Sequence, residues 1–302
     1  MKIFPNNSRV CFIGDSITHK NGYVSYIFDY YIQKYKQKNV TFFNCGISGA
    51  TAKQQIELLN DDILLYKPTH AVIMLGVNDS RHPLLGEMRD GERYAKLVAA
   101  FEEYQKNIEI LCNGLREKNV EIILCTPAPY DEFTLSEVPS LKGGYALIQG
   151  YSEFIRDFAA KKGIAVCDYH KYMTQIIQSE TIYESDHVHP NARGQFYMAK
   201  CFLQFQGEDL GDFFPLPQYL DEWRDTVKHL RDVYSAEHLM LHSFFLDSKE
   251  GTELIHEYLE KKPNVREVYK YLAQQYFLYK PKQNDLRNEI ICLTNAFYES
   301  SC

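Results

Sequence analysis

The sequence predicts an α/β domain in which a five-stranded parallel sheet is covered by helices on both faces, a doubly wound three-layer fold. Two observations carry this prediction. From residue 9 to about residue 205, short apolar runs alternate with longer amphipathic runs, as expected of successive βαβ units. After that point strand-like runs cease and only helical periodicity remains, which predicts a helical C-terminal extension.

The short apolar runs are the expected strands. Each is a continuous apolar stretch, which is typical of a strand buried on both faces of a parallel sheet. The five runs are 10–13, 40–43, 71–75, 120–125 and 164–167.

The expected helices lie between these strands. From Tyr23 to Gln37, aromatic and aliphatic residues recur at spacings of three and four, which is the period of a helix. A second helix is expected from Ala52 to Leu65, because Pro68 ends it. The remaining helices are expected at 94–118, 145–162 and 192–205.

The sequence predicts two domains with a boundary near residue 208. Residues 1–208 contain all the expected strands, and residues 209–302 form the α-helical extension. Its numerous aromatic side chains favour a packed helical core and a seam with the first domain. A lid, or a surface that joins the chain into a homo-oligomer, is the alternative. Helical periodicity covers 218–245, 249–261, 264–280 and 284–300.

Composition excludes several classes of partner. The 302 residues carry 33 Lys and Arg against 40 Asp and Glu, a formal net charge of −7 that should repel nucleic acid. No run approaches the ~18 apolar residues of a membrane span, and the start lacks the apolar stretch of a signal peptide. We therefore expect a cytoplasmic protein. The 8 cysteines form no C-x-x-C pair, which argues against a zinc ribbon.

Reactive side chains follow the ends of the predicted strands, where open α/β sheets bind ligands. Ser16 follows the first strand, Gly49 the second and Asn78 the third. Asp186 and His189 lie in the turn before the last helix. Because the carboxyl ends of parallel strands share one edge, these residues are expected to converge.

Together they supply the groups of a serine hydrolase. A serine hydroxyl needs a base, a group that orients the base, and donors for the developing oxyanion. Ser16 is the candidate nucleophile, His189 the candidate base and Asp186 its orienting carboxylate. The backbone N–H groups of Ser16 and Gly49 and the side-chain amide of Asn78 are the candidate oxyanion-hole donors. The prediction is a carboxylic-ester hydrolase with a Ser-His-Asp triad.

The same residues carry a family resemblance. In this order along the chain, four blocks resemble the SGNH hydrolase superfamily, also called GDSL-type esterases and lipases. The similarity covers residues 9–205 and also touches 126–129 and Asp168. The blocks are Gly14-Asp15-Ser16, Gly49, Gly76-Val77-Asn78-Asp79 and Asp186-His187-Val188-His189-Pro190.

This resemblance implies a flavodoxin-like sheet and acyl-ester hydrolysis without a cofactor. It places Ser16, Gly49, Asn78 and His189 in the four name-giving roles, and Asp186 completes the triad. The family implies nothing firm about the helical extension.

Competing interpretations of the same motifs are weaker. Ser48 lacks the G-x-S-x-G spacing of a nucleophile elbow, so it is interpreted as a turn residue. His187 and His189 form an H-x-H pair, but two imidazoles with only Asp186 nearby make a poor zinc site. No phosphate loop or dinucleotide fingerprint occurs, so neither a metal nor a cofactor is expected.

The substrate is less constrained than the chemistry. His19, Arg81 and His82 follow the site loops and are expected either to contact substrate or to be solvated. With Glu87 and Arg89, the polar stretch after Asn78 favours removal of a short acyl group, above all acetyl, from a carbohydrate or similar polar small molecule. The resemblance also allows lysophospholipase-type and thioesterase-type substrates. A non-catalytic binding module and an acyltransferase on the same fold are the further alternatives.

Overall fold

The computed structural model describes residues 3–208 apart from 21, 36, 37, 39, 61, 62, 88 and 89. Every structural statement below refers to these residues. The helical extension predicted for 209–302, the domain boundary before it and the oligomer it was expected to form lie outside the described residues.

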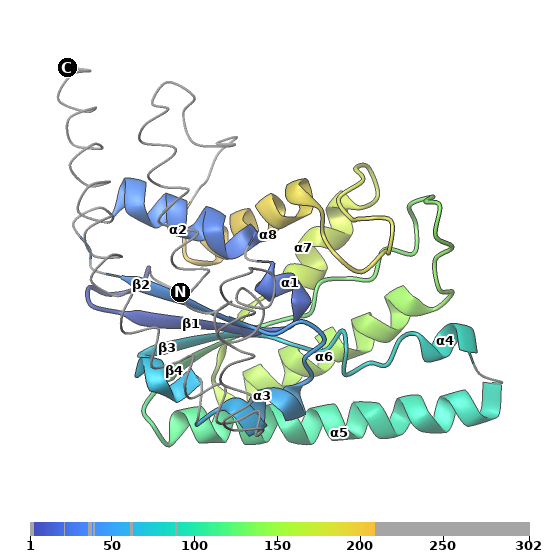
Figure 1. Ribbon diagram of the computed structural model, residues 1–302, viewed down its shortest axis with the longest axis horizontal. Coiled ribbons are helices and arrows are strands. Elements are labelled where there is room, and N and C mark those ends of the chain that lie inside the picture. Colours follow the sequence, from blue (N-terminus) through green and yellow to red (C-terminus); the bar gives the residue numbers. More distant parts are fainter. Residues whose placement is uncertain are drawn as a thin grey trace, which may run out of the picture.

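Five parallel strands form one sheet in the order β2-β1-β3-β4-β5 (Figure 1). This is the flavodoxin-like order, in which the chain changes direction across the sheet between β1 and β3 and leaves a crevice at that point. The prediction of a doubly wound five-stranded parallel sheet is therefore confirmed. The strands are β1 (Arg9–Gly14), β2 (Thr41–Gly46), β3 (His70–Met74), β4 (Glu121–Cys125) and β5 (Ala165–Cys167).

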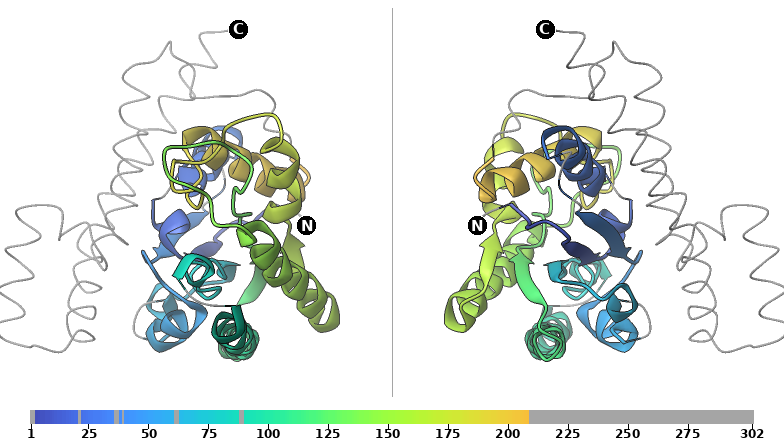
Figure 2. Two further views of the ribbon diagram at one scale, coloured as in Figure 1. Left: turned by 90° about the vertical axis from the view of Figure 1, so that its right-hand side faces the viewer. Right: turned by 90° about the vertical axis from the view of Figure 1, so that its left-hand side faces the viewer.

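Helices cover both faces of the sheet, as the two end views show (Figure 2). On one face lie α2 (Gly22–Lys34), α7 (Tyr169–Ile176) and α8 (Ala192–Phe205). On the other face lie α3 (Ala52–Leu58), α5 (Asp90–Arg116) and α6 (Gly144–Lys162). The short elements α1 (Ser16–His19), η1 (Ile63–Tyr66) and α4 (Leu84–Glu87) lie in the connections.

Side chains of β1, which lies between β2 and β3, alternate between the two cores because successive residues of a strand point to opposite faces. Val10 and Phe12 of β1 pack with the cluster under α2, α7 and α8. Cys11 and Ile13 pack with the cluster above α3, α5 and α6. All four are fully buried, which explains why this strand reads as a continuous apolar run.

Strand β2 runs three residues beyond its predicted end at residue 43. The reason is Asn44, whose side-chain amide donates to the Thr18 carbonyl at 2.8 Å and whose Oδ1 accepts from the Gly46 N–H at 3.0 Å. A polar side chain can lie in a buried strand when its hydrogen bonds are satisfied in this way. The ladder consequently continues to the pairing of Gly14 with Gly46.

Two helical predictions need correction. The helix expected over 52–65 ends at Leu58, and a separate 3-10 helix follows at Ile63–Tyr66. Helix α7 was not predicted, although Tyr169, Met173 and Ile176 follow helical spacing, because the segment after the fifth strand was interpreted only as a connection. Among the described residues, no helix combines the length and apolar character needed to cross a membrane.

Candidate active site

The carboxyl ends of β1 and β2 are held together by a buried amide. Gln55 of α3 is fully buried and donates from Nε2 to the carbonyl oxygens of Gly14, at 2.8 Å, and Cys45, at 3.1 Å. Gly14 is the last residue of β1, and Cys45 is the last but one of the neighbouring strand β2. Gln55 therefore fixes the edge of the sheet from which the predicted site residues project.

Ser16 is placed by a turn too tight for a side chain at Gly14. A Cβ on Gly14 would lie 2.1 Å from Thr18 Oγ1 and 3.0 Å from the Met74 carbonyl, so the turn requires glycine. Asp15 then caps α1 by accepting from the Ile17 N–H at 3.0 Å. Ser16 occupies the first position of this helix and is half-buried.

Ser16 is joined to His189 and Asp186 in one chain of hydrogen bonds. Its Oγ lies 2.7 Å from His189 Nε2, and His189 Nδ1 lies 2.5 Å from Asp186 Oδ2. Because a carboxylate only accepts, Nδ1 carries the proton, and Nε2 of the neutral ring is left to accept from the serine hydroxyl. The predicted nucleophile, base and orienting carboxylate thus lie in hydrogen-bond contact.

Asp186 is held by the turn that carries it. Its Oδ1 accepts from the backbone N–H groups of Val188, at 3.0 Å, and His189, at 2.9 Å. Partial burial acts to raise the pKa of this carboxyl, but the hydrogen bonds from His189 and Val188 outweigh burial and hold the pKa below its usual value. Asp186 is therefore a carboxylate at neutral pH.

The loops that carry Gly49 and Asn78 are joined by a hydrogen bond at the same edge. Ala50 N–H donates to the Ile47 carbonyl at 3.0 Å, which closes a turn in which Gly49 has a φ of 77° that favours glycine. The Asn78 amide donates to the Ala50 carbonyl at 3.1 Å. An amide carries two hydrogens, so this bond leaves the second one for another acceptor.

Two buried carboxyl groups brace these loops. Asp79 accepts from the Ala52 N–H at 2.9 Å and thereby ties the end of β3 to the start of α3. Burial raises the pKa of Asp79 to about 6. Burial also raises the pKa of Asp15 to about 7, helped by the charge of Asp79 and opposed by the bond from Ile17. Asp79 therefore joins the loop after β3 to the start of α3.

The other predicted neighbours of the site differ in what they contact. His82 is half-buried, with Nδ1 3.3 Å from the Val77 carbonyl, and burial lowers its pKa against an opposing influence of Asp186. Arg81 forms an exposed ion pair with Glu103 at 3.3 Å. His82 therefore lies within electrostatic reach of the Asp186–His189 pair.

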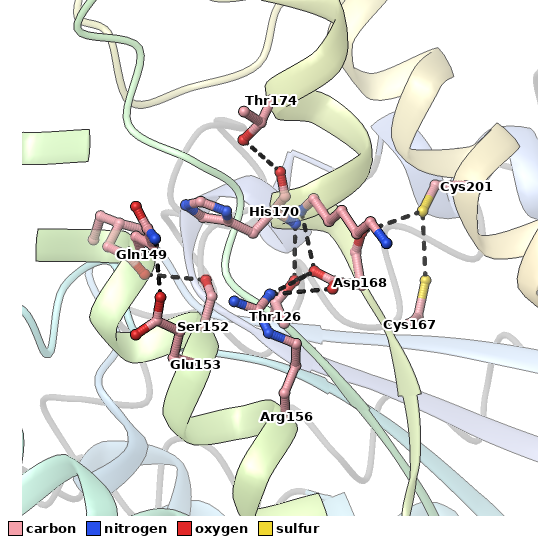
Figure 3. A network of polar contacts seen from close by, with 12 residues as sticks. Thr126, Gln149, Ser152, Glu153, Arg156, Cys167, Asp168, His170, Thr174 and Cys201 are labelled. Atoms are coloured by element: carbon pink, nitrogen blue, oxygen red, sulfur yellow. Dashed lines mark hydrogen bonds and ion pairs between the residues drawn. The ribbon is translucent and has the colours of Figure 1, made fainter. Parts of the chain in front are cut away.

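Thr126 and Asp168 belong to a second polar network, at the ends of β4 and β5 (Figure 3). Asp168 accepts from Thr126 Oγ1 at 3.0 Å and receives Arg156 Nη1 at 3.1 Å on both oxygens. It also caps α7 by accepting from the Lys171 N–H. A cavity of about 470 Å³, lined in part by Arg156, Asp168 and His170, opens beside this network.

In the part of the chain that the structure describes, no group of three or more His, Cys, Asp or Glu side chains converges as a metal site would. Sequence reasoning overlooked Gln55 and Asn44, whose long-range hydrogen bonds shape the edge of the sheet. A buried position for either amide has no signal in a periodicity pattern, because both lie among ordinary helix and strand residues.

Comparison with known families decides the relationship. The GDSL-like Lipase/Acylhydrolase family matches residues 12–195. The chain belongs to this family. That range contains every predicted site residue, and the resemblance seen in the sequence is confirmed. The chain is accordingly a hydrolase of the esterase and acylhydrolase type.

One sequence relative and two solved structures are similar to this chain. An acetylxylan esterase of Geobacillus stearothermophilus is 24% identical over 219 residues, which cover 66% of this chain and 94% of the relative. The crystal structure of that type of esterase from the same organism has a TM-score of 0.58 at 22% identity, over 69% of this chain and 98% of the other. A gut microbial diltiazem-metabolizing enzyme has a TM-score of 0.76 at 17% identity, over 97% and 96% of the two chains. The structural similarities establish the fold.

Proposed function

We propose that this protein is a serine esterase that removes short acyl groups, above all acetyl, from a carbohydrate or similar polar small molecule. The observation that supports it most strongly is the unbroken chain of hydrogen bonds from Ser16 Oγ through the His189 imidazole to Asp186. A hydroxyl in contact with an oriented neutral imidazole is the arrangement that activates a serine nucleophile.

In the acylation step, Ser16 Oγ attacks the ester carbonyl carbon while His189 Nε2 takes its proton. The tetrahedral oxyanion accepts hydrogen bonds from the backbone N–H groups of Ser16 and Gly49 and from the second hydrogen of the Asn78 amide. Collapse of the intermediate breaks the bond to the alcohol oxygen, which takes the proton back from His189. The products are the free alcohol and an acyl-serine.

In the deacylation step, His189 acts as base again. It takes a proton from water, which attacks the acyl carbon and forms a second oxyanion in the same position. Ser16 leaves with the proton from His189, and the carboxylic acid is released. Asp186 stabilises the imidazolium that forms in each half of the reaction. Because His189 must be neutral to act, activity is expected to fall on the acid side of neutrality.

A polar acetylated substrate is supported by the acetylxylan esterase, which this chain matches over 94% of that relative's length. The polar side chain of His82, which lies within electrostatic reach of the Asp186–His189 pair, favours the same class. Long-chain lipid esters are the alternative to be tested. Hydrolysis of p-nitrophenyl acetate should exceed that of p-nitrophenyl octanoate, and the reverse preference would replace the carbohydrate ester with a lipid ester.

The central experiment compares Ser16→Ala with Ser48→Ala in the hydrolysis of p-nitrophenyl acetate. Ser48 is an exposed serine in a neighbouring loop at the same edge and serves as the matched control. We expect Ser16→Ala to lower kcat by about 10³-fold or more and Ser48→Ala to leave it unchanged. Equal activity of wild type and Ser16→Ala would remove the proposed nucleophile. An inactive but folded wild type would favour a binding module, and product analysis with sugar acceptors separates hydrolysis from acyl transfer.

A further inference from the structure

His187 lies between Asp186 and His189, yet its side chain serves neither of them. The imidazole is 2% exposed and its Nε2 lies 2.6 Å from the Val138 carbonyl and 3.0 Å from Ser136 Oγ. Because a carbonyl oxygen only accepts, Nε2 carries a proton and donates it to Val138. The imidazole is therefore fastened to a loop 49 residues away in the sequence.

The loop that receives this bond, residues 130–143, is held firmly at its base. Leu141 N–H donates to Tyr130 Oη at 2.8 Å. The Glu132 carboxylate accepts from the Gly143 N–H at 2.9 Å and from the Tyr145 N–H at 3.1 Å. A loop closed by several hydrogen bonds to its own backbone offers a fixed anchor to a neighbouring segment.

Two further bonds join the same two loops. The His187 carbonyl accepts from the Asp131 N–H at 2.9 Å. Ser136 Oγ lies 2.9 Å from the Ser185 carbonyl, to which it can donate. The segment from Ser185 to His187 is thus tied to the 130–143 loop through backbone and side chain alike, and Figure 1 shows the two loops side by side at its upper right.

The backbone of His187 explains what this connection achieves. Its φ of 64° lies in the left-handed region, which residues other than glycine adopt at an energetic cost. That conformation turns the chain so that the N–H groups of Val188 and His189 return to Asp186 Oδ1. The same turn directs Asp186 Oδ2 at His189 Nδ1.

We propose that His187 is a positioning residue for the Asp186–His189 pair. Its imidazole, anchored on Val138, holds the left-handed turn that keeps Asp186 and His189 aligned with Ser16. This inference rests on the proposed esterase function. Loss of the anchor leaves the triad residues present but lets the turn relax, so the chemical step slows while ground-state binding of substrate is little affected.

The test uses three variants in the full-length chain. His187→Gly removes the imidazole but accepts the left-handed backbone, and His187→Gln returns an N–H donor at a similar reach. Ser140→Ala is the matched control, since Ser140 lies in the same loop and its Oγ contacts Glu132 rather than His187. We expect His187→Gly to lower kcat for p-nitrophenyl acetate by roughly 10- to 100-fold with KM within about twofold. His187→Gln should recover a large part of the loss, and Ser140→Ala should behave as wild type.

A second readout does not depend on turnover. The short bond between His189 Nδ1–H and Asp186 should give a downfield proton resonance in NMR spectra of wild type and of Ser16→Ala. In His187→Gly this resonance should broaden or disappear while circular dichroism remains that of the folded protein. If the wild type hydrolyses no ester, the proposed function fails, whereas the resonance still tests the positioning role.

Three results would overturn the role of His187. One is an unchanged kcat and an unchanged resonance in His187→Gly. Another is an effect on KM alone. The third is a loss of activity that matches the unfolded fraction measured by circular dichroism, with no recovery in His187→Gln, which would reduce His187 to a residue that only supports the fold.

Discussion

Two carboxylates at the same edge of the sheet have chemically different partners. Asp186 binds the imidazole of His189, whereas Asp168 binds the guanidinium of Arg156. Each also accepts backbone N–H groups of its own turn, so the local geometry is similar. An imidazole gains and loses a proton near neutral pH, but a guanidinium keeps its proton.

The hydroxyl group in each network shows the consequence. Thr126 is fully buried, and its Oγ1 donates to Asp168 while it accepts from the His170 N–H. Ser16 is half-buried, and its Oγ faces Nε2 of the His189 imidazole. The Thr126 hydroxyl bonds directly to its carboxylate and braces the ends of β4 and β5. The Ser16 hydroxyl is separated from its carboxylate by an imidazole and is a candidate nucleophile.

Among the variants that test this difference, Asp186→Asn is expected to have the largest effect on kcat. Unlike a carboxylate, the amide can donate a hydrogen bond to His189 Nδ1, which favours the tautomer whose Nε2 carries the proton and cannot accept from Ser16. We expect kcat to fall by about 10³-fold or more with little change in the melting temperature. Asp168→Asn, assayed in parallel, should retain a kcat within about twofold of wild type. Similar kinetic losses in both variants would mean that the two networks do not differ in role.

A smaller kinetic effect is expected for Asn78→Ala. This variant removes one of the three proposed oxyanion donors and leaves the backbone N–H groups of Ser16 and Gly49. We expect kcat to fall by about 10²-fold, because a hydrogen bond to the oxyanion is strongest in the transition state. Steady-state kinetics with p-nitrophenyl acetate measure this. Full activity in a folded Asn78→Ala protein would contradict the assignment.

The free energy of unfolding is expected to depend more on the Asp168 network than on the Asp186 network, which is the reverse of the order expected for kcat. Asp168→Asn removes the charge that faces Arg156, and both side chains are partly exposed, at 24% and 34%. We expect the free energy of unfolding in urea to fall by about 1 to 2 kcal/mol, the range for charge-assisted hydrogen bonds reduced for solvent screening. Lys162→Gln, which breaks the more exposed pair with Glu109, is the control and should cost less than about 0.5 kcal/mol. Equal losses in the two variants would show that the Asp168–Arg156 pair stabilises the fold no more than an exposed ion pair does.

A further expected effect concerns the pH dependence of stability, through the buried carboxyl group of Asp15. Burial raises the pKa of Asp15 from 3.8 to about 7, so between these values the native state holds a proton that the unfolded state has lost. Its contribution to stability therefore falls as pH rises through this window. Asp15→Asn keeps an acceptor for the Ile17 N–H but has no proton to lose. The difference between the melting temperatures of Asp15→Asn and wild type should grow in favour of the variant from pH 4 to pH 7. A difference that stays constant with pH would contradict the raised pKa.

Much of the fold was predictable because its signals are local. The apolar runs that became β1 and β3 are short, continuous and buried on both faces, so their period and composition agree with their final environment. The extension of β2 through Asn44 was not predictable, because a polar residue enters a buried strand only when a distant partner, here Thr18, satisfies it. Helix α7 was missed although its apolar spacing is present in the sequence.

The candidate site, like the fold, was predictable where its signals are local and unpredictable where distant segments pack together. That Ser16, Gly49 and Asn78 come directly after strands could be seen in the sequence, and parallel topology then brings them to one edge. The pairing of Asp186 with His189 was predicted from their places three residues apart in one turn, and the two side chains lie in hydrogen-bond contact. The pairing of Asp168 with Arg156 was not predicted, because it depends on how α6 packs against the end of β5.

The sequence by itself determined which reactive side chains follow which strands. It also determined that a serine, a histidine and a carboxylate meet at one edge of the sheet. Only the tertiary structure decided what holds them there. The tie from His187 to Val138 and the bonds of Gln55 to Gly14 and Cys45 join segments far apart in the chain. Periodicity and composition report the local environment of a residue, whereas such contacts depend on how separate loops pack.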